Sequence, residues 1–318
     1  MESPQNVKKR LKSVKNIKQI TKAMELVSAT KMRKSQQIAL DSRPYAFLAL
    51  NLLATVSNLN QSASWRTPEL FKIRKIKKVL FVLVSSDKGL AGAFNSSVIK
   101  KFEQHMQRDK EKYAKEEKFF VAVGEKSFAY LSKKNVDIVK KFVQVGDHTT
   151  PEQVEPLTDF IIKRYLEKKW DRVVIFSTHF RSALKQEPHV RRILPIDFNH
   201  IKETVQELIP ERGKFADLIK EHNISFVPDK NKLKEYLIEP SAEKVLSKLA
   251  RHLFFMQVYH LILEANASEH SARRLAMKTA SDNASDLAGA LNLQYNKSRQ
   301  SAITKEITEI IAGAEAQS

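Results

Sequence analysis

The sequence contains no cysteine, few helix breakers and no long hydrophobic run. Without cysteine, disulfide bridges, thiolate metal sites and a cysteine nucleophile are excluded. No uninterrupted apolar run is longer than that of residues 79–84, which is far shorter than the roughly 20 residues that span a bilayer. With 42% hydrophobic residues and a formal net charge of +19, the 318-residue chain is expected to be a soluble, basic protein with a sizeable core.

The seven glycines and ten prolines are unevenly distributed. Residues 241–318 contain no proline and two glycines, and residues 5–43 contain neither. Residues 68–240 hold eight of the prolines and five of the glycines. Because these residues interrupt helices most strongly, the chain is expected to have a helical start, a mixed middle and a helical end.

Residues 241–312 are predicted to form one long helix with Ser241 as its N-cap. Apolar residues recur three and four positions apart on one face, at Val245, Leu249, Leu253, Met256, Tyr259 and Leu263. Such a helix would be about 100 Å long, so it must protrude from a compact domain or break into a hairpin. Gly289 is the only internal breaker before residue 312. Since no turn cluster surrounds it, the single helix is favoured.

The N-terminal region is predicted to form a second amphipathic helix that ends or kinks at Pro44, with residues 45–56 resuming a helical pattern. Its apolar residues mostly follow a three-residue spacing, at Val7, Leu11, Val14, Ile17, Ile20, Met24 and Val27. On a straight helix, apolar residues at this spacing shift gradually around the helix axis. A left-handed supercoil would keep them facing a partner helix. Two such helices at opposite ends of the chain favour an antiparallel coiled coil. The alternative is that each packs on the central domain as an ordinary surface helix.

The middle of the chain alternates strand and helix patterns. Strands are predicted at 77–86, 119–123, 136–145 and 171–178, and helices at 95–107, 125–133 and 151–168. Continuous apolar strands that alternate with helices indicate a parallel sheet covered on both faces.

The long C-terminal helix has two stretches with little apolar surface, residues 268–283 and 294–306. Small side chains permit a close approach of helices, whereas polar ones indicate contact with something other than a dry core. A solvated face explains any single residue here. The length of the helix nevertheless favours a partner that surrounds it.

No catalytic constellation is evident, and no cofactor is expected. The loop containing Gly89 and Gly92 follows a strand and precedes a helix, as phosphate loops do. It lacks the Gly-Lys-Ser/Thr end and the three-glycine fingerprint, so a structural turn is favoured over the alternative of a nucleotide-binding enzyme. His252 and His260 on the long helix do not form an H-E-x-x-H zinc motif.

The basic N-terminal region leaves a different class of function open. Residues 1–45 contain eleven Lys and Arg against three acidic residues, which would suit a coiled-coil protein that binds nucleic acid. Aromatic residues are not interleaved with the lysines, and no recognition module follows. The positive face could equally meet acidic protein loops or anionic lipid, and charge alone does not separate these alternatives.

Four separated motifs, in order along nearly the whole chain, resemble the gamma subunit of F-type ATP synthases of the bacterial type. They are KKRLKSVKNIKQITKAMELVSATKMRKSQ (8–36), SSDKGLAGAFN (85–95), NASEHSARRLAMKTASDNA (266–284) and YNKSRQSAITKEITEIIAGA (295–314). The resemblance implies an α/β protein, in which a long antiparallel coiled coil of the N- and C-terminal helices is joined to a Rossmann-like α/β domain with a mainly parallel sheet.

The same resemblance implies the central rotor shaft of a proton-translocating ATP synthase. In that family the shaft couples rotation of the c-subunit ring to conformational change in the beta-subunit catalytic sites, and it is not catalytic itself. The implied partners are the alpha and beta subunits, the epsilon subunit and the c ring, without nucleic acid. Contact with the membrane would occur only through the complex.

Site residues follow from the motifs that match. The resemblance implies beta-subunit contacts at Met24, Lys18, Lys22, Arg299, Gln300, Thr304 and Glu306. It implies contacts at the foot of the shaft, near the c ring, for Tyr236 and Glu239 in the segment YLIEP. Ile238 stands where an aromatic residue is expected, so it is not included.

The predicted domains are an N-terminal coiled-coil helix (1–58), an α/β domain (76–196), a charged insertion and connection (197–240) and a C-terminal coiled-coil helix (241–318). The stretches 60–74 and 197–234 look longer than in a minimal family member. Without cysteine, the thiol switch of chloroplast relatives is not expected. The first motif begins within ten residues of Met1, which favours a bacterial protein at the cytoplasmic side of the plasma membrane.

Overall fold

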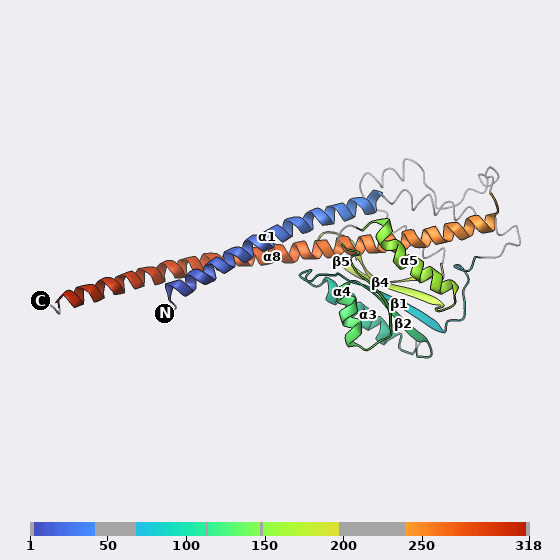
Figure 1. The fold of residues 1–318 in the computed structure, drawn as a ribbon, viewed down its shortest axis with the longest axis horizontal. Coiled ribbons are helices and arrows are strands. Elements are labelled where there is room, and N and C mark those ends of the chain that lie inside the picture. Colours follow the sequence, from blue (N-terminus) through green and yellow to red (C-terminus); the bar gives the residue numbers. More distant parts are fainter. Residues whose placement is uncertain (1–2, 42–67, 112–113, 147–148, 197–238, 316–318) are drawn as a thin grey trace. The chain divides into compact units, whose positions relative to one another are not determined.

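The computed structural model describes residues 3–41, 68–111, 114–146, 149–196 and 239–315 (Figure 1). Its elements are α1 (Pro4–Asp41), β1 (Lys78–Val84), α3 (Phe94–Arg108), β2 (Glu117–Val123), α4 (Glu125–Lys133), β3 (Ile138–Phe142), α5 (Pro151–Leu166), β4 (Arg172–Phe180), β5 (Gln186–Leu194) and α8 (Ala242–Glu315). The chain divides into two compact units, Met1–Thr30 with Arg273–Ser318, and Lys31–Ala272. The two units are described separately below as the helical unit and the α/β unit.

The α/β unit is built on a five-stranded sheet in the order β3-β2-β1-β4-β5. Neighbouring strands β3, β2, β1 and β4 are parallel, whereas β5 pairs with β4 in the antiparallel direction. The four strands predicted from the sequence are present, and the α/β fold class with its mainly parallel sheet is confirmed. Strand β5 was not predicted.

Helices cover both faces of this sheet (Figure 1). On one face, α3 and α4 pack over alternate residues of the central strands, with Val79, Phe81 and Leu83 of β1 in that cluster. On the other face, Leu80, Val82 and Val84 of β1 pack with α5 and the first part of α8. A strand with buried side chains on both faces needs a continuous apolar run, and residues 79–84 provide it.

Gly124 ends β2 at a point where no side chain fits. Its φ of +94° lies in a region that L-residues avoid. A Cβ atom built there would lie 2.2 Å from the carbonyl oxygen of Ser85. Ser85 Oγ in turn accepts a hydrogen bond from the backbone N–H of Ser127 at 2.6 Å. The close approach therefore ties the end of β1 to the start of α4.

Helix α8 is one continuous helix of 74 residues, about 110 Å long. The prediction of a single helix rather than a hairpin is confirmed, and the backbone N–H of Lys244 donates to Ser241 Oγ at 3.4 Å, as expected of an N-cap. None of the helices in the described ranges is both long and apolar enough to cross a membrane.

The first part of α8 is buried on every side from residue 258 to residue 271. Several of its polar side chains are hydrogen-bonded within the α/β unit, whereas the buried Ser268 hydroxyl has no hydrogen-bond partner among the described residues. Asn266 Nδ2 donates to the Val145 carbonyl at 3.0 Å, and Ser271 Oγ donates to the Ala183 carbonyl at 2.7 Å. The polar stretch that begins at residue 268 was predicted to need an external partner, but its first turn is covered by this chain's own domain.

The helical unit pairs the start of α1 with the end of α8. Val7, Leu11 and Leu291 are buried together, with Val14, Ala288 and Tyr295 against them. Further along α1, Lys18 Nζ donates to Ser285 Oγ at 2.9 Å. Residue numbers rise along α1 as they fall along α8, so the helices are antiparallel, as predicted.

The seam between these helices follows the apolar stripe predicted for α1 only at its start, at Val7, Leu11 and Val14. The buried residues of α1 in this unit fall on one seven-residue repeat, at Val7, Leu11, Thr21, Glu25 and Ser28. The buried residues Met277, Ser281, Ala284 and Leu291 of α8 follow the same repeat. Residues in contact along a coiled coil recur every 3.5 positions on average. Apolar residues spaced three apart therefore rotate away from the partner helix within a few turns. Ile17, Ile20 and Val27 are therefore more than half exposed, at 51%, 60% and 53%.

Some predicted features lie outside the described residues. They are the helical pattern at 45–56, residues 60–67 of the first insertion and the second insertion at 197–234. Helix α1 is described as far as Asp41, and the proline predicted to end or kink it, Pro44, also lies outside the described residues.

Candidate functional site

The loop after β1 uses its polar groups to hold the fold together. The backbone N–H of Ser86 donates to Asn95 Oδ1 at 3.0 Å, and Asn95 Nδ2 donates to Ser86 Oγ at 2.7 Å. The Asp87 carboxylate accepts from the backbone N–H groups of Glu125 at 3.1 Å and Gln144 at 2.9 Å. Asp87 therefore joins the carboxyl ends of three neighbouring strands, which supports the structural-turn interpretation of this loop.

One group of predicted contact residues lies on α1. Lys18 and Lys22 are exposed and one helical turn apart, and Met24 is half-buried. Lys18 reaches across to Ser285, while Lys22 Nζ pairs with Glu25 Oε2 at 2.9 Å. Exposed lysines with single weak partners keep most of their hydrogen-bonding capacity for another molecule.

The other predicted group lies near the end of α8. Arg299, Gln300, Thr304 and Glu306 are all exposed. Thr304 Oγ1 donates to the Gln300 carbonyl at 3.0 Å, so this hydroxyl can accept but not donate further. Arg299 is fourteen residues beyond Ser285, or about 21 Å along the helix. The two groups therefore form separate patches on the helical unit.

Only one of the two predicted foot residues lies within the described ranges. Glu239 is exposed, and Tyr236 lies outside the described residues.

Exposed apolar side chains were missed as a feature of the helical unit. The end of α8 carries Ile303, Ile307, Ile310 and Ile311, which are 47–71% exposed. Their spacing of three and four residues places them on one face. Together with Ile17, Ile20 and Val27 of α1, they leave much apolar surface open. The sequence signal was present, because the same isoleucines end the last motif.

A buried carboxylate lies between two histidines in the α/β unit. His179 Nδ1 is 2.7 Å from Glu264 Oε2, and His260 Nε2 is 3.0 Å from Glu264 Oε1. Burial alone would raise the pKa of Glu264, but the charge of His260 and the hydrogen bonds from both histidines outweigh it and hold the pKa well below its ordinary value. No group of three acidic or histidine side chains within the described ranges is arranged to hold a metal ion.

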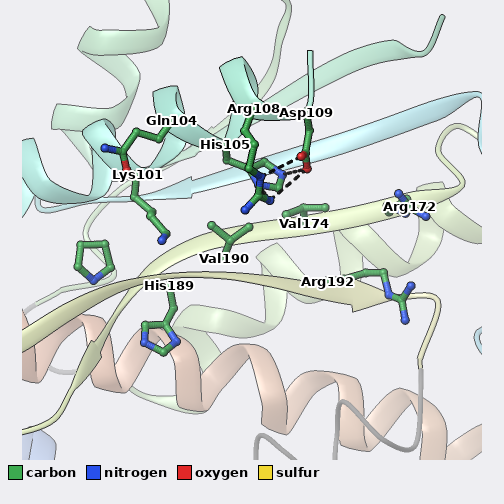
Figure 2. Close-up of a pocket in the computed structure, with 11 residues that line it drawn as sticks. Lys101, Gln104, His105, Arg108, Asp109, Arg172, Val174, His189, Val190 and Arg192 are labelled. Atoms are coloured by element: carbon green, nitrogen blue, oxygen red, sulfur yellow. Dashed lines mark hydrogen bonds and ion pairs between the residues drawn. The ribbon is translucent and has the colours of Figure 1, made fainter. Parts of the chain in front are cut away.

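A basic pocket of about 690 Å³ lies between α3, β4 and β5. Its lining residues are Lys101, Gln104, His105, Arg108, Asp109, Arg172, Val174, Pro188, His189, Val190 and Arg192. Figure 2 shows His105, Arg108 and Asp109 as one cluster at the end of α3, and Arg172 and Arg192 on neighbouring strands. Sequence reasoning missed this pocket because its residues come from three elements far apart in the chain.

Comparison with known proteins identifies the family. The family model described as ATP synthase matches residues 3–317. The ATP synthase gamma chain of Opitutus terrae is 37% identical over 313 residues, which cover 98% of each chain. The ATP synthase gamma chain of Roseiflexus sp. (strain RS-1) is 33% identical over 317 residues, which cover 99% of each chain.

Solved structures share the fold at lower identity. A chain of the Euglena gracilis mitochondrial ATP synthase, described as OSCP/F1/c-ring in rotational state 3, matches with a TM-score of 0.61 and 19% identity over 99% of this chain and 94% of that one. A chain of the Tetrahymena thermophila mitochondrial ATP synthase, described as central stalk/c-ring, matches with a TM-score of 0.56 and 20% identity over 82% of this chain and 99% of that one. The resemblance drawn from the four motifs is thus confirmed, and the chain belongs to the family of ATP synthase gamma chains.

Proposed function

We propose that this chain is the central rotor shaft of a proton-translocating F-type ATP synthase. It couples rotation of a c-subunit ring to conformational change in beta-subunit catalytic sites and is not catalytic itself. The observation that carries the proposal is the exposed apolar face at the end of α8, formed by Ile303, Ile307, Ile310 and Ile311. The full-length match to gamma chains supports it.

The exposed isoleucines favour enclosure by a partner. From residue 299 to residue 314, all side chains but that of Ala302 are exposed. Burying the remaining surface of a half-exposed isoleucine is worth about 1 kcal/mol. The four isoleucines lie on one face, so the free energy gained by covering them depends on which partner surface packs against that face.

A shaft whose sides differ in chemistry can act on the subunits around it as it rotates. The helical unit presents isoleucines on one face and Arg299 and Glu306 beside them. A subunit that meets this side of the helix is stabilised in a different conformation from one that meets the opposite side. Rotation would therefore change the relative stabilities of the open and closed states at each catalytic site in turn.

The two patches of the helical unit are the proposed beta-subunit contacts. Arg299, Gln300, Thr304 and Glu306 would contact the segment of beta known in the family as the catch. Lys18 and Lys22, beside Met24, would face an acidic lever of the beta subunit, where two exposed ammonium groups can pair with carboxylates.

The α/β unit is the proposed foot of the shaft. Residues 76–196 would brace it where the epsilon subunit and the c ring bind, with Glu239 and Tyr236 as contacts near the ring. The helices 1–58 and 241–318 would form the shaft, and residues 197–240 would connect it to the foot. The bacterial relatives support a peripheral position at the cytoplasmic side of the plasma membrane, held there through the complex.

Reconstitution tests the proposal. An alpha–beta hexamer is assayed for ATP hydrolysis with and without the full chain, and a tagged chain is used to co-purify its partners. We expect the chain to stimulate hydrolysis and to recover alpha and beta subunits. The proposal would be rejected if only nucleic acid co-purified with the chain, or if adding the chain did not change ATP hydrolysis by the hexamer.

A further inference from the structure

We propose that the basic pocket between α3, β4 and β5 binds a small anion that carries two phosphate groups. This inference goes beyond the proposed function and does not depend on it. The pocket runs along β4 and β5. One end lies at Arg172, the first residue of β4, and the other at Pro188, which pairs with Thr178 near the end of β4.

The charge of the pocket matches a diphosphate. Four cationic side chains, Lys101, Arg108, Arg172 and Arg192, and one carboxylate, Asp109, line it. With neutral histidines these groups give a net charge of +3. Each phosphate monoester carries a charge of about −1.5 to −2 at neutral pH, so two phosphate groups neutralise the pocket. A single phosphate or carboxylate would leave it positive.

Two of the arginines are neighbours on one face of the sheet. Val174 pairs with Arg192 across β4 and β5, so Arg172 and Arg192 are diagonal neighbours on the same face of the sheet. Like charges at such positions destabilise a sheet. An anion bound beside both guanidinium groups can accept a charge-assisted hydrogen bond from each of them.

Arg172 also has unused hydrogen-bonding capacity. Its Nε atom is buried and has no hydrogen-bond partner in the structure. Leaving a buried donor unpaired costs free energy. Arginine donates through a planar fork whose geometry fits two oxygens of one phosphate. A phosphate seated on this fork would satisfy the donor.

The remaining lining gives the pocket a size limit and an apolar floor. Its volume of about 690 Å³ falls in the range of small-molecule sites. Val174 and Val190 lie between the strand arginines and α3 (Figure 2). Arg108 is already held by Asp109, with Nε 3.0 Å from Oδ1 and Nη2 3.3 Å from Oδ2. Arg172, whose buried Nε is unpaired, is therefore the main anchor for the anion.

Titration calorimetry of the full chain with inorganic pyrophosphate, in magnesium-free buffer at low salt, tests the site. We expect saturable binding to a single site and a rise in the midpoint of thermal unfolding. The double variant Arg172→Gln/Arg192→Gln should bind at least about tenfold more weakly and lose most of the thermal shift, since two charge-assisted contacts are removed.

The control removes the same charge from the other face of the sheet. Lys163→Gln/Arg164→Gln on α5 should bind pyrophosphate like the unaltered chain. Equal weakening in both double variants would show general charge attraction and overturn the site, as would the absence of saturable binding. Citrate, which offers carboxylates instead of phosphates, should bind more weakly, and equal affinity for citrate would overturn the phosphate assignment. The hexamer assay above is unaffected by any of these outcomes, so the two proposals fail separately.

Discussion

His179 Nδ1 and Glu264 Oε2 lie 2.7 Å apart and join strand β4 to helix α8 inside the α/β unit. Both side chains are buried, and His260 approaches the second carboxylate oxygen from one turn earlier on α8. One carboxylate thus satisfies two buried imidazoles. This arrangement makes Glu264 a strong determinant of how α8 is held in the domain.

Glu264→Leu should destabilise the chain. Leucine fills a similar volume but leaves His179 and His260 without their acceptor, at a cost of roughly 1–3 kcal/mol for each buried group left unpaired. Urea denaturation of the full chain measures the loss. Glu155→Leu, at an exposed position of α5, should change the free energy of unfolding by no more than about 0.5 kcal/mol. Equal effects of the two variants would contradict the role of Glu264.

Acid should remove the contribution of Glu264 to stability. Its pKa is lowered in the folded chain, so the contribution is complete above the unfolded value of about 4.3 and disappears as pH falls through the folded value. Between pH 5 and pH 3, the free energy of unfolding should fall more steeply for the unaltered chain than for Glu264→Gln. Parallel pH profiles from urea denaturation would argue against a depressed pKa.

Gly124→Ala should be among the most damaging small substitutions. The positive φ and the 2.2 Å approach to the Ser85 carbonyl oxygen together predict a loss of about 2–5 kcal/mol. Gly289→Ala is the matched control, because nothing lies within 4 Å of a Cβ atom there. It should stabilise α8 by up to about 1 kcal/mol. Thermal unfolding distinguishes the two, and a tolerated Gly124→Ala would mean that the turn relaxes.

Arg299→Ala with Gln300→Ala should lower ATP turnover of the reconstituted complex by about tenfold, which corresponds to roughly 1.4 kcal/mol of lost contact energy. Both side chains are exposed, so circular dichroism of the isolated chain should not change. Lys278→Ala with Thr279→Ala alters two exposed residues of the same helix outside the proposed contact. If both double variants retain full turnover, Arg299 and Gln300 are not coupling contacts.

Ile303→Gln with Ile307→Gln should weaken association with the alpha–beta hexamer. Removing two apolar contacts of about 1 kcal/mol each predicts a dissociation constant some 10- to 100-fold higher. The isolated variant should keep its helicity and bind less of a hydrophobic dye. Unaltered affinity would show that this face of α8 meets solvent in the complex.

The sequence was sufficient to predict most of the sheet and both long helices. Residues 79–84 are apolar throughout, and the C-terminal region has no proline, so local patterns and structure agree. Strand β5 was missed because Gln186, Glu187, Arg191 and Arg192 make it polar and Pro188 interrupts it. An edge strand needs only partial burial, so its pattern is weak.

The seam of the helical unit could not be predicted in the same way. Ile17 and Ile20 look like core residues, yet Thr21 and Glu25 are buried in their place. Periodicity shows that a helix has an apolar face but not which partner covers it. The basic pocket and the Glu264 cluster depend on contacts between distant elements. Only the four-residue spacing of His260 and Glu264 was visible in the sequence.

The burial of residues 258–271 has a consequence for biosynthesis. The sheet is encoded between residues 78 and 194 and leaves the ribosome early, but the part of one face that α5 does not cover is covered by side chains between Leu246 and Ala265. The nascent domain therefore carries an uncovered apolar surface until the last quarter of the polypeptide has been translated. A chain that terminates before α8 would keep that surface open and be a substrate for chaperones and proteases.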